Sequence, residues 1–441
     1  MVIKLLHLSD IHMGSGFSHG RINPETGLNT RLEDFALALR RCVDSAIANQ
    51  VDLVLFGGDA FPDATPPPYI HQIFAKEFCR LVEADIPTVL LVGNHDQHAQ
   101  GVGGASLCIY RTLGVPGFIV GDRLTTHRID TKSGPMQVVT LPWLTRSTLL
   151  TKPETHGLSM GEVGELLLDR LRIVLESEIR KLDKTIPTVL LAHLMTDTAR
   201  YGAEKFLAVG KGFTVPMAIL TRDCFDYIAL GHVHRYQEVC KSPLAIYPGS
   251  IERVDFSEEK EEKGYLLVDV GKGQASAEFC RIPARVFKTL VVDLTSDEQP
   301  QTALLKAIEA EDIEEKVIRL IYKLRADQSE EIDNALVSEA LSAAHSYTVQ
   351  PEFVSQLSRP RLPELGVDNS LSPMSALQAY LDNREDLSAI TPDIIEAAHG
   401  LLNQDPHGDK KIVAPEQDAS EDALNPPDTT EEDETRQLRL L

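Results

Sequence analysis

Short, continuous apolar runs recur along the first 285 residues of the chain, and each one ends in a cluster of polar side chains. Five of these runs occupy residues 3–12, 51–59, 87–96, 187–193 and 226–234. Runs of this length without polar alternation are typical of strands that are covered on both faces. Three further strands are expected at 137–143, 244–250 and 264–270.

Helical patterns separate these runs. Residues 31–50 place Leu32, Phe35 and Leu39 on one apolar stripe, and residues 162–182 have the same period. The alternation of strands and helices predicts a layered α/β domain over residues 1–285. Sheets of this kind place their ligands at the carboxyl ends of the strands, which is where the polar clusters lie.

The pattern changes at residue 286, where a second, smaller domain is predicted to begin. Residues 286–294 and 316–325 are typical of strands, and residues 302–311 between them are typical of a helix. This order predicts a small α+β domain over residues 286–350. Residues 351–370 are rich in proline and polar side chains, so we expect a linker there.

Two short helices and an acidic tail are expected at the end of the chain. The helices lie within residues 371–404, at 373–383 and 392–403, and each has a capped start in which Ser or Thr precedes Pro. Residues 405–441 contain few hydrophobic and many acidic side chains, which predicts a disordered tail.

Composition favours a cytoplasmic protein that does not enter membranes. No stretch reaches the roughly 20 apolar residues that a membrane span needs. Lys4, His7 and Asp10 interrupt the first apolar run, so a secretory signal is not expected. The six cysteines are scattered and form no CxxC pair, which favours a reduced, cytosolic protein with free thiols.

The acidic balance of the chain is uneven. The formal net charge is −23, yet residues 1–285 carry 30 basic and 34 acidic side chains, whereas residues 286–441 carry 13 and 32. The acidity therefore lies mainly in the last third of the chain. Bound divalent cations would offset the negative charge of an acidic site. Bulk charge neither supports nor excludes nucleic acid as a substrate.

The clusters at the five strand ends contain side chains that bind divalent metals. They are Asp10, His12, Asp59, Asn94, His95, His193, His232 and His234. Carboxylate, amide oxygen and imidazole together suit Mn²⁺, Fe²⁺ or Zn²⁺ better than Ca²⁺. In an extended segment residues i and i+2 point the same way, so both members of an Asp-x-His or His-x-His pair can face one ion. The glycines before Asp59 and Asn94 let the backbone approach a metal or a phosphate closely.

Each of these residues also has an ordinary structural interpretation. Asp10 alone could be a loop residue or a helix cap, and His193 alone could be a core histidine. Five strand ends in this order favour a metal site over coincidence. Four other histidines do not belong to a motif of candidate ligands and are interpreted as structural: His7, His19, His71 and His98.

In order and spacing these motifs resemble the calcineurin-like metallophosphoesterase superfamily over residues 1–255. They read Asp10-Ile-His12, Gly58-Asp59, Gly93-Asn94-His95-Asp96, Ala192-His193 and Gly231-His232-Val-His234. Within that superfamily the chain looks most like the SbcD subfamily, the nuclease subunits of bacterial SbcCD complexes. The segments that carry this likeness are LLHLSDIHMG, GGDAF before PPPYI, and YPGSIERVDFSEE before KGYLLVD. The resemblance is weakest after residue 290.

The resemblance implies a fold, an activity and partners. The fold would be an α/β/β/α sandwich with a capping domain after residue 286, and residues 371–404 would bind an SbcC-like ATPase of the SMC family. The activity would be that of an exonuclease on double-stranded DNA ends and an endonuclease on single strands or hairpins. The subunit would act as a homodimer within a heterotetramer. It would lie in the cytoplasm and associate with the nucleoid.

The resemblance also assigns the site. One metal ion would be held by Asp10, His12, Asp59 and His234, and the other by Asp59, Asn94, His193 and His232, with Asp59 bridging. Mn²⁺ is the expected metal, and Mg²⁺ and Fe²⁺ are alternatives. His95 would donate a proton to the leaving sugar oxygen or stabilise its charge, and Asp96 would orient His95.

Two departures from the family pattern leave questions open. Pro62 stands where archaeal and eukaryotic relatives carry a histidine that assists catalysis or positions a metal. Whether Asp63 takes over that role is left open by the sequence. The Gly14–Thr30 loop, longer than usual, either alters DNA contact or is a tolerated surface insertion. No arginine typical of Ser/Thr phosphatases follows Asp59. A hydrolase of small phosphoesters or cyclic nucleotides, and a scaffold for the ATPase, remain alternatives.

Overall fold

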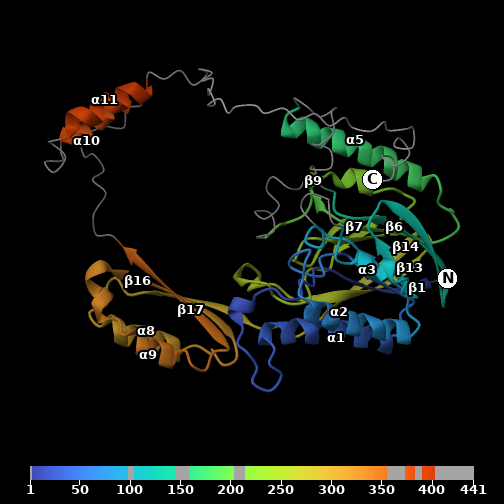
Figure 1. The fold of residues 1–441 in the computed structure, drawn as a ribbon, viewed down its shortest axis with the longest axis horizontal. Coiled ribbons are helices and arrows are strands. Elements are labelled where there is room, and N and C mark those ends of the chain that lie inside the picture. Colours follow the sequence, from blue (N-terminus) through green and yellow to red (C-terminus); the bar gives the residue numbers. More distant parts are fainter. Residues whose placement is uncertain are drawn as a thin grey trace, which may run out of the picture.

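Two six-stranded sheets pack against each other in the computed structural model (Figure 1). The structure describes residues 2–97, 104–144, 158–202, 214–354, 373–382 and 390–402. The first sheet has the order β14-β13-β1-β2-β3-β4. Its strands are β1 (Val2–Leu8), β2 (Leu53–Phe56), β3 (Thr88–Leu91), β4 (Phe118–Gly121), β13 (Gly264–Gly271) and β14 (Gln274–Arg281). Strands β1 to β4 are parallel, and β13 is antiparallel to both of its neighbours.

The second sheet has the order β11-β12-β10-β7-β6-β5. Its strands are β5 (Thr125–Thr131), β6 (Gly134–Leu141), β7 (Thr188–His193), β10 (Tyr227–Gly231), β11 (Gln237–Lys241) and β12 (Leu244–Tyr247). The four inner strands are parallel, and the two edge strands are antiparallel to their neighbours. The five apolar runs that end in candidate ligands are therefore inner strands of the two sheets: β1, β2, β3, β7 and β10.

Helices cover the outer face of each sheet. Between the sheets, Leu5, Leu55 and Val89 of the first pack with Leu191 and Ala229 of the second. Helices α1 (Thr30–Ala48), α2 (Pro68–Glu83) and α3 (Cys108–Thr112) pack on the first sheet, and α5 (Met160–Ile179) and α7 (Met217–Leu220) on the second. The predicted α/β/β/α sandwich is confirmed, and the helices expected at 31–50 and 162–182 are α1 and α5.

Polar caps determine where the two long helices begin. The Asn29 side chain accepts a hydrogen bond from the backbone N–H of Arg31 at the start of α1. Ser159 and Glu162 form a capping box at the start of α5. These side chains satisfy N–H groups that have no partner within the helix.

A small domain follows the sandwich. Its parallel sheet has the order β15-β16-β17, with β15 (Phe287–Asp293), β16 (Val317–Arg325) and β17 (Ser346–Val354). Helix α8 (Pro300–Glu309), the 3-10 helix η4 (Ala326–Glu331) and α9 (Asn334–Ala340) lie on the connections. The remaining short elements are η1 (Phe17–His19), β8 (Met195–Thr196), β9 (Thr214–Val215) and η3 (Phe256–Glu258).

Strand β17 ends later than the sequence pattern suggested. It pairs with β16 up to Val354, so residues 351–354 belong to the sheet and not to the expected linker. Pro351 misled the interpretation, because proline is rare in central strands but is tolerated at an edge, and β17 is an edge strand. The rest of the expected linker and the expected acidic tail lie outside the described residues.

The loop of residues 14–30 contacts the small domain. Thr30 Oγ1 lies 2.8 Å from His345 Nε2, and the Ser346 hydroxyl donates to the carbonyl oxygen of His19 at 2.7 Å. The loop therefore helps to join the two domains. Its two interpretations, altered DNA contact and a tolerated surface insertion, stay predictions.

Two helices follow in the last described segments. They are α10 (Pro373–Asp382) and α11 (Thr391–Leu402), which lie side by side in Figure 1 and match the predicted helices to within one residue. None of the helices in the described part of the chain is long and apolar enough to cross a membrane.

Candidate metal centre

The side chains predicted to bind metal converge at the carboxyl ends of β1, β2, β3, β7 and β10. Three groups of carboxylate and imidazole side chains form there, and the ligand atoms within each group all lie within 4.8 Å of one another. The groups are Asp10, His12 and His234; His12, Asp59 and His95; and Asp59, His193 and His232. Because His12 and Asp59 each belong to two groups, the three groups form one continuous site.

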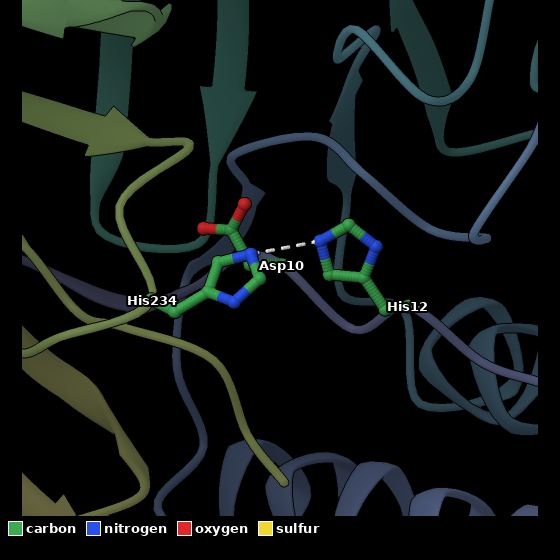
Figure 2. A group of neighbouring side chains, drawn as sticks. All are labelled: Asp10, His12 and His234. Atoms are coloured by element: carbon green, nitrogen blue, oxygen red, sulfur yellow. Dashed lines mark hydrogen bonds between the residues drawn. The ribbon is translucent and has the colours of Figure 1, made fainter. Parts of the chain in front are cut away.

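The first group joins the loop after β1 to the segment after β10 (Figure 2). The Nε2 atoms of His12 and His234 lie 3.0 Å apart, and His12 Nε2 lies 3.7 Å from Asp59 Oδ2. The Asp10 carboxylate accepts hydrogen bonds from the backbone N–H of His232 at 3.0 and 3.1 Å. Two imidazole nitrogens that face each other at this distance cannot both carry a proton, and a cation beside them suits their lone pairs.

Asn94 completes the group on the opposite side of Asp59. Its Oδ1 atom lies 3.0 Å from His193 Nε2 and 2.8 Å from His232 Nδ1. His193 Nε2 also lies 3.3 Å from Asp59 Oδ2. The other ring nitrogen of His193 lies 2.7 Å from the carbonyl oxygen of Gly57. A proton on that nitrogen leaves Nε2 free to bind a metal.

Four of the predicted ligands have a left-handed backbone. They are Asp10 (φ 53°), His12 (φ 47°), Asp59 (φ 58°) and His232 (φ 102°). The Asp10 N–H donates to the Gly58 carbonyl at 2.9 Å, and the His12 N–H to the Asp59 carbonyl at 3.0 Å, which holds the loop in this form. The expectation that Asp10 and His12 lie in an extended segment is therefore wrong, because β1 ends at Leu8. A left-handed backbone is unfavourable for residues other than glycine, and these hydrogen bonds offset part of its cost.

The glycines beside the ligands are required by close packing. A Cβ atom on Gly93 would lie 2.1 Å from Asp59 Oδ1, and one on Gly58 would lie 2.6 Å from His193 Nδ1. Neither position accepts a side chain without displacing a candidate ligand. The backbone at both motifs therefore lies against candidate ligands, and its approach to a metal or a phosphate stays a prediction.

Asp96 does not orient His95, contrary to the expectation. Its buried carboxylate accepts hydrogen bonds at 2.8–2.9 Å from three backbone N–H groups, those of Asp59, Ala60 and Gly93. It therefore ties the loop after β2 to the loop after β3. Burial, with the nearby Asp59 charge, raises the pKa of Asp96 to about 7.

His95 is held by the backbone of Pro62 instead. His95 Nδ1 lies 2.8 Å from the carbonyl oxygen of Pro62. A proton on Nδ1 leaves Nε2 as the nitrogen that can act in the group with His12 and Asp59. Asp63 is exposed, and its carboxylate accepts a hydrogen bond from the Thr65 N–H at 2.8 Å. The contact that orients His95 therefore comes from the main chain at position 62.

The charges of the site are strongly coupled. Burial opposes ionisation of Asp59, but the imidazoles of His193 and His95 hold the pKa of that carboxyl well below its usual range. Burial also lowers the pKa of His193, but the Asp59 charge outweighs it and raises that pKa to about 9. Burial lowers the pKa values of His12 and His232. His12 and His232 are therefore neutral, the form in which imidazole binds metals.

Two neighbours of the site were not among the residues predicted from the sequence. Glu258 Oε1 accepts a hydrogen bond from His234 Nδ1 at 2.6 Å, and the Trp143 ring lies 4.8 Å from the His232 ring. Glu258 lies in the YPGSIERVDFSEE segment among several other acidic residues, and Trp143 ends an expected strand, so neither segment showed that these side chains contact the site.

Of the four histidines interpreted as structural, the three in the described residues lie outside these groups. His7 Nδ1 lies 2.9 Å from the Tyr227 hydroxyl in the core, and His19 and His71 pack against aromatic rings. His98 lies outside the described residues.

The donor set fits a pair of divalent cations. Asp59 Oδ2 lies between an imidazole nitrogen of His12 on one side and one of His193 on the other, so one carboxylate can serve two ions. Carboxylate, amide oxygen and neutral imidazole are ligands that suit Mn²⁺, Fe²⁺ and Zn²⁺.

The family model of calcineurin-like phosphoesterases matches residues 3–236. That range contains the five strand ends and the whole of the site described above. The chain belongs to this family, and it is therefore a metal-dependent hydrolase.

Solved structures resemble the chain at low sequence identity. The TT1561 protein of Thermus thermophilus is 17% identical, with a TM-score of 0.36 over 63% of this chain and 99% of its own. A dimetal phosphatase from Danio rerio is 13% identical, with a TM-score of 0.38 over 62% of this chain and 98% of its own. The purple acid phosphatase PPD1 from yellow lupin (Lupinus luteus) is 13% identical, with a TM-score of 0.36 over 64% of this chain and 52% of its own.

Proposed function

We propose that this chain is a metal-dependent DNA phosphodiesterase, the nuclease subunit of an SbcCD-type complex that processes DNA ends. One divalent cation is held by Asp10, His12, Asp59 and His234, and a second by Asp59, Asn94, His193 and His232. Mn²⁺ is the expected metal. The observation that carries the proposal is the position of Asp59 Oδ2, 3.7 Å from His12 Nε2 and 3.3 Å from His193 Nε2, between the two sets of ligands.

Each part of the site has a chemical task. When bound, two such cations clamp phosphate oxygens and lower the pKa of water. His95 belongs to the same group of ligand atoms, and its Nε2 is the nitrogen left for the reaction because Nδ1 donates to the Pro62 carbonyl. A protonated His95 can therefore give its Nε2 proton to the leaving sugar oxygen or stabilise its negative charge.

DNA as the substrate rests on the parts of the chain outside the site. The small domain after residue 286 and the helices α10 and α11 contribute none of the predicted metal ligands, and they lie where the resemblance implies a capping domain and an ATPase-binding segment. We assign residues 371–404 to the docking of an SbcC-like SMC ATPase. The subunit then acts as a homodimer within a heterotetramer, cutting double-stranded ends as an exonuclease and single strands or hairpins as an endonuclease.

The decisive experiment compares substrates with and without the partner. Linear duplex DNA, bis-p-nitrophenyl phosphate and a phosphoprotein are each incubated with Mn²⁺ and the chain, alone and with the SMC-like ATPase and ATP. Degradation of DNA ends that needs both partner and ATP is the expected result. Activity on bis-p-nitrophenyl phosphate without any action on DNA would favour a small-phosphoester hydrolase. Inactivity on every substrate, with the partner still bound, would favour a scaffold.

A deletion tests the partner-binding segment. The full chain is expected to co-purify with the ATPase, and a variant lacking residues 371–404 is expected not to. Both forms should hydrolyse bis-p-nitrophenyl phosphate equally, because every predicted ligand precedes residue 235. Co-purification that survives the deletion would place the docking surface elsewhere.

A further inference from the structure

Glu258 supports a candidate ligand from outside the metal site. Its Oε1 atom accepts a hydrogen bond from His234 Nδ1 at 2.6 Å. The opposite nitrogen of that ring, Nε2, faces His12 Nε2 at 3.0 Å. A carboxylate on the remote nitrogen of a ligand imidazole fixes the orientation of the ring and the position of its proton, and it increases the basicity of the ligand nitrogen.

Glu258 is itself tightly held. Its Oε2 atom lies 2.6 Å from Lys263 Nζ and accepts hydrogen bonds from the Ser250 hydroxyl at 3.1 Å and the Val254 N–H at 3.2 Å. Glu258 is 4% exposed and Lys263 is 2% exposed. One carboxylate oxygen therefore serves His234 and the other a buried cation, so the side chain cannot turn away without losing both.

The small domain contacts the residues on each side of Glu258. Phe256 packs edge-on against Phe287 of β15, with ring centroids 4.9 Å apart. The guanidinium carbon of Arg319, on β16, lies 4.5 Å from the centre of the Phe256 ring. Two strands of the small domain therefore enclose this ring.

A second contact lies one residue beyond Glu258. The Glu259 carboxylate accepts hydrogen bonds from the Thr289 N–H at 3.1 Å and from the Thr289 hydroxyl at 2.7 Å. Thr289 belongs to β15, so the same strand contacts the chain on both sides of Glu258. The main chain at Glu258 cannot shift while the small domain stays docked.

We infer that Glu258 is a positioning residue for His234. We also infer that the position of the small domain, through its contacts with the η3 segment, determines the position of the His234 ring. A movement of β15 and β16 that pulls on Phe256 or Glu259 displaces the Glu258 carboxylate and turns the His234 ring. Docking of the small domain thereby sets how tightly the Asp10, His12 and His234 group holds its cation. This inference rests on the metal centre proposed above and not on DNA as the substrate.

The test measures Mn²⁺ affinity and stoichiometry by titration calorimetry on the full chain. Glu258→Gln is expected to weaken binding by about 10- to 100-fold at one of the two sites, the effect typical of losing such a support. Glu261→Gln is the matched control, because Glu261 also pairs with Lys263, at 2.9 Å, but contacts none of the candidate ligands. It should leave the affinity unchanged.

A second variant guards against misfolding. Glu258→Asp keeps a negative charge near Lys263 but is one methylene too short to hold His234 in place, so it should also weaken Mn²⁺ binding. Wild-type affinity in a folded Glu258→Gln or Glu258→Asp chain would overturn the positioning role. A wild-type chain that binds no Mn²⁺ would instead overturn the metal centre, a separate and recognisable result.

The link to the small domain is tested by a double-mutant cycle. Phe256→Ala should weaken Mn²⁺ binding by about 5-fold or more, a typical coupling between distant sites. Added to Glu258→Gln, it should cause no further loss, because both changes act on one contact. Glu311→Gln, which removes an ion pair with Lys288 on the same domain, should have no effect. If the fold-losses of Mn²⁺ affinity in the two single variants multiply in the double variant, the coupling between the small domain and His234 does not run through Glu258.

Discussion

The Nδ1 atom of His95 lies 2.8 Å from the backbone carbonyl oxygen of Pro62. The contact belongs to the main chain, so it does not depend on which side chain occupies position 62. The loss of a histidine at that position therefore leaves the orientation of His95 intact.

His95→Asn should abolish hydrolysis while leaving metal binding intact. Asparagine cannot deliver the Nε2 proton, so the rate on bis-p-nitrophenyl phosphate should fall by about 10²- to 10⁴-fold. Mn²⁺ affinity, measured by calorimetry, should stay at the wild-type value. His71→Asn is the control, since His71 lies in none of the three ligand groups, and it should retain full activity. A His95→Asn chain that turns over at the parental rate would remove His95 from the chemistry.

His234→Ala and Asp59→Asn should lower metal content to different degrees. His234 belongs to one group of ligands, whereas Asp59 lies between two. We therefore expect His234→Ala to lose one of two Mn²⁺ ions and Asp59→Asn to weaken both sites. Metal analysis by mass spectrometry after dialysis against Mn²⁺ gives the stoichiometry. Equal losses in the two variants would contradict the sharing of Asp59.

Asp96→Asn should destabilise the fold. The change places an amide N–H against backbone N–H groups that now donate to the Asp96 carboxylate. Loss of a buried acceptor costs about 1–3 kcal/mol. Urea unfolding with a chelator present separates this cost from any loss of metal. Asp63→Asn, at an exposed position, should change the free energy of unfolding by no more than about 0.5 kcal/mol.

His7 should make the protein sensitive to acid. Burial lowers the pKa of His7 from 6.5 to about 3, so between these values the unfolded chain binds a proton that the folded chain does not. Stability therefore falls as the pH drops below 6.5, by up to about 1.4 kcal/mol per pH unit from this group. His7→Gln should lose that part of the slope in urea unfolding measured between pH 7 and 5.

A control separates the charge of His7 from its hydrogen bond. Tyr227→Phe removes the partner of His7 Nδ1 but keeps the buried imidazole. It should lower stability at all pH values and retain the acid slope. The same slope in wild type and His7→Gln would assign the acid sensitivity to other groups.

The apolar runs made the sandwich and the location of the site predictable. Strands β2, β3, β7 and β10 are buried along their whole length and β1 along its second half, so each appears in the sequence as a largely apolar segment with a ligand at its end or within three residues of it. Because the carboxyl ends of parallel strands meet at one edge, convergence of these ligands followed from the pattern.

Local conformation and remote contacts could not be predicted in this way. The left-handed backbone of Asp10 and His12 depends on hydrogen bonds to the loop after β2, which no spacing within residues 10–12 reveals. Adjacency in sequence suggested that Asp96 supports His95, but the carbonyl of Pro62 is nearer in space. Glu258 was hidden among similar acidic residues, because only its contact with His234 distinguishes it.

Each of the two sets of ligands combines residues that follow strands of both sheets, and this has a consequence for handling the protein. His12 and His234 are 222 residues apart in the chain; His12 follows β1 of the first sheet and His234 follows β10 of the second. A cation bound by both residues would link the two sheets and stabilise the folded chain, as a cross-link that closes a long loop does. Removal of the metal by a chelator should therefore lower the melting temperature as well as the activity. Samples that lose metal during storage should show both decreases at the same time.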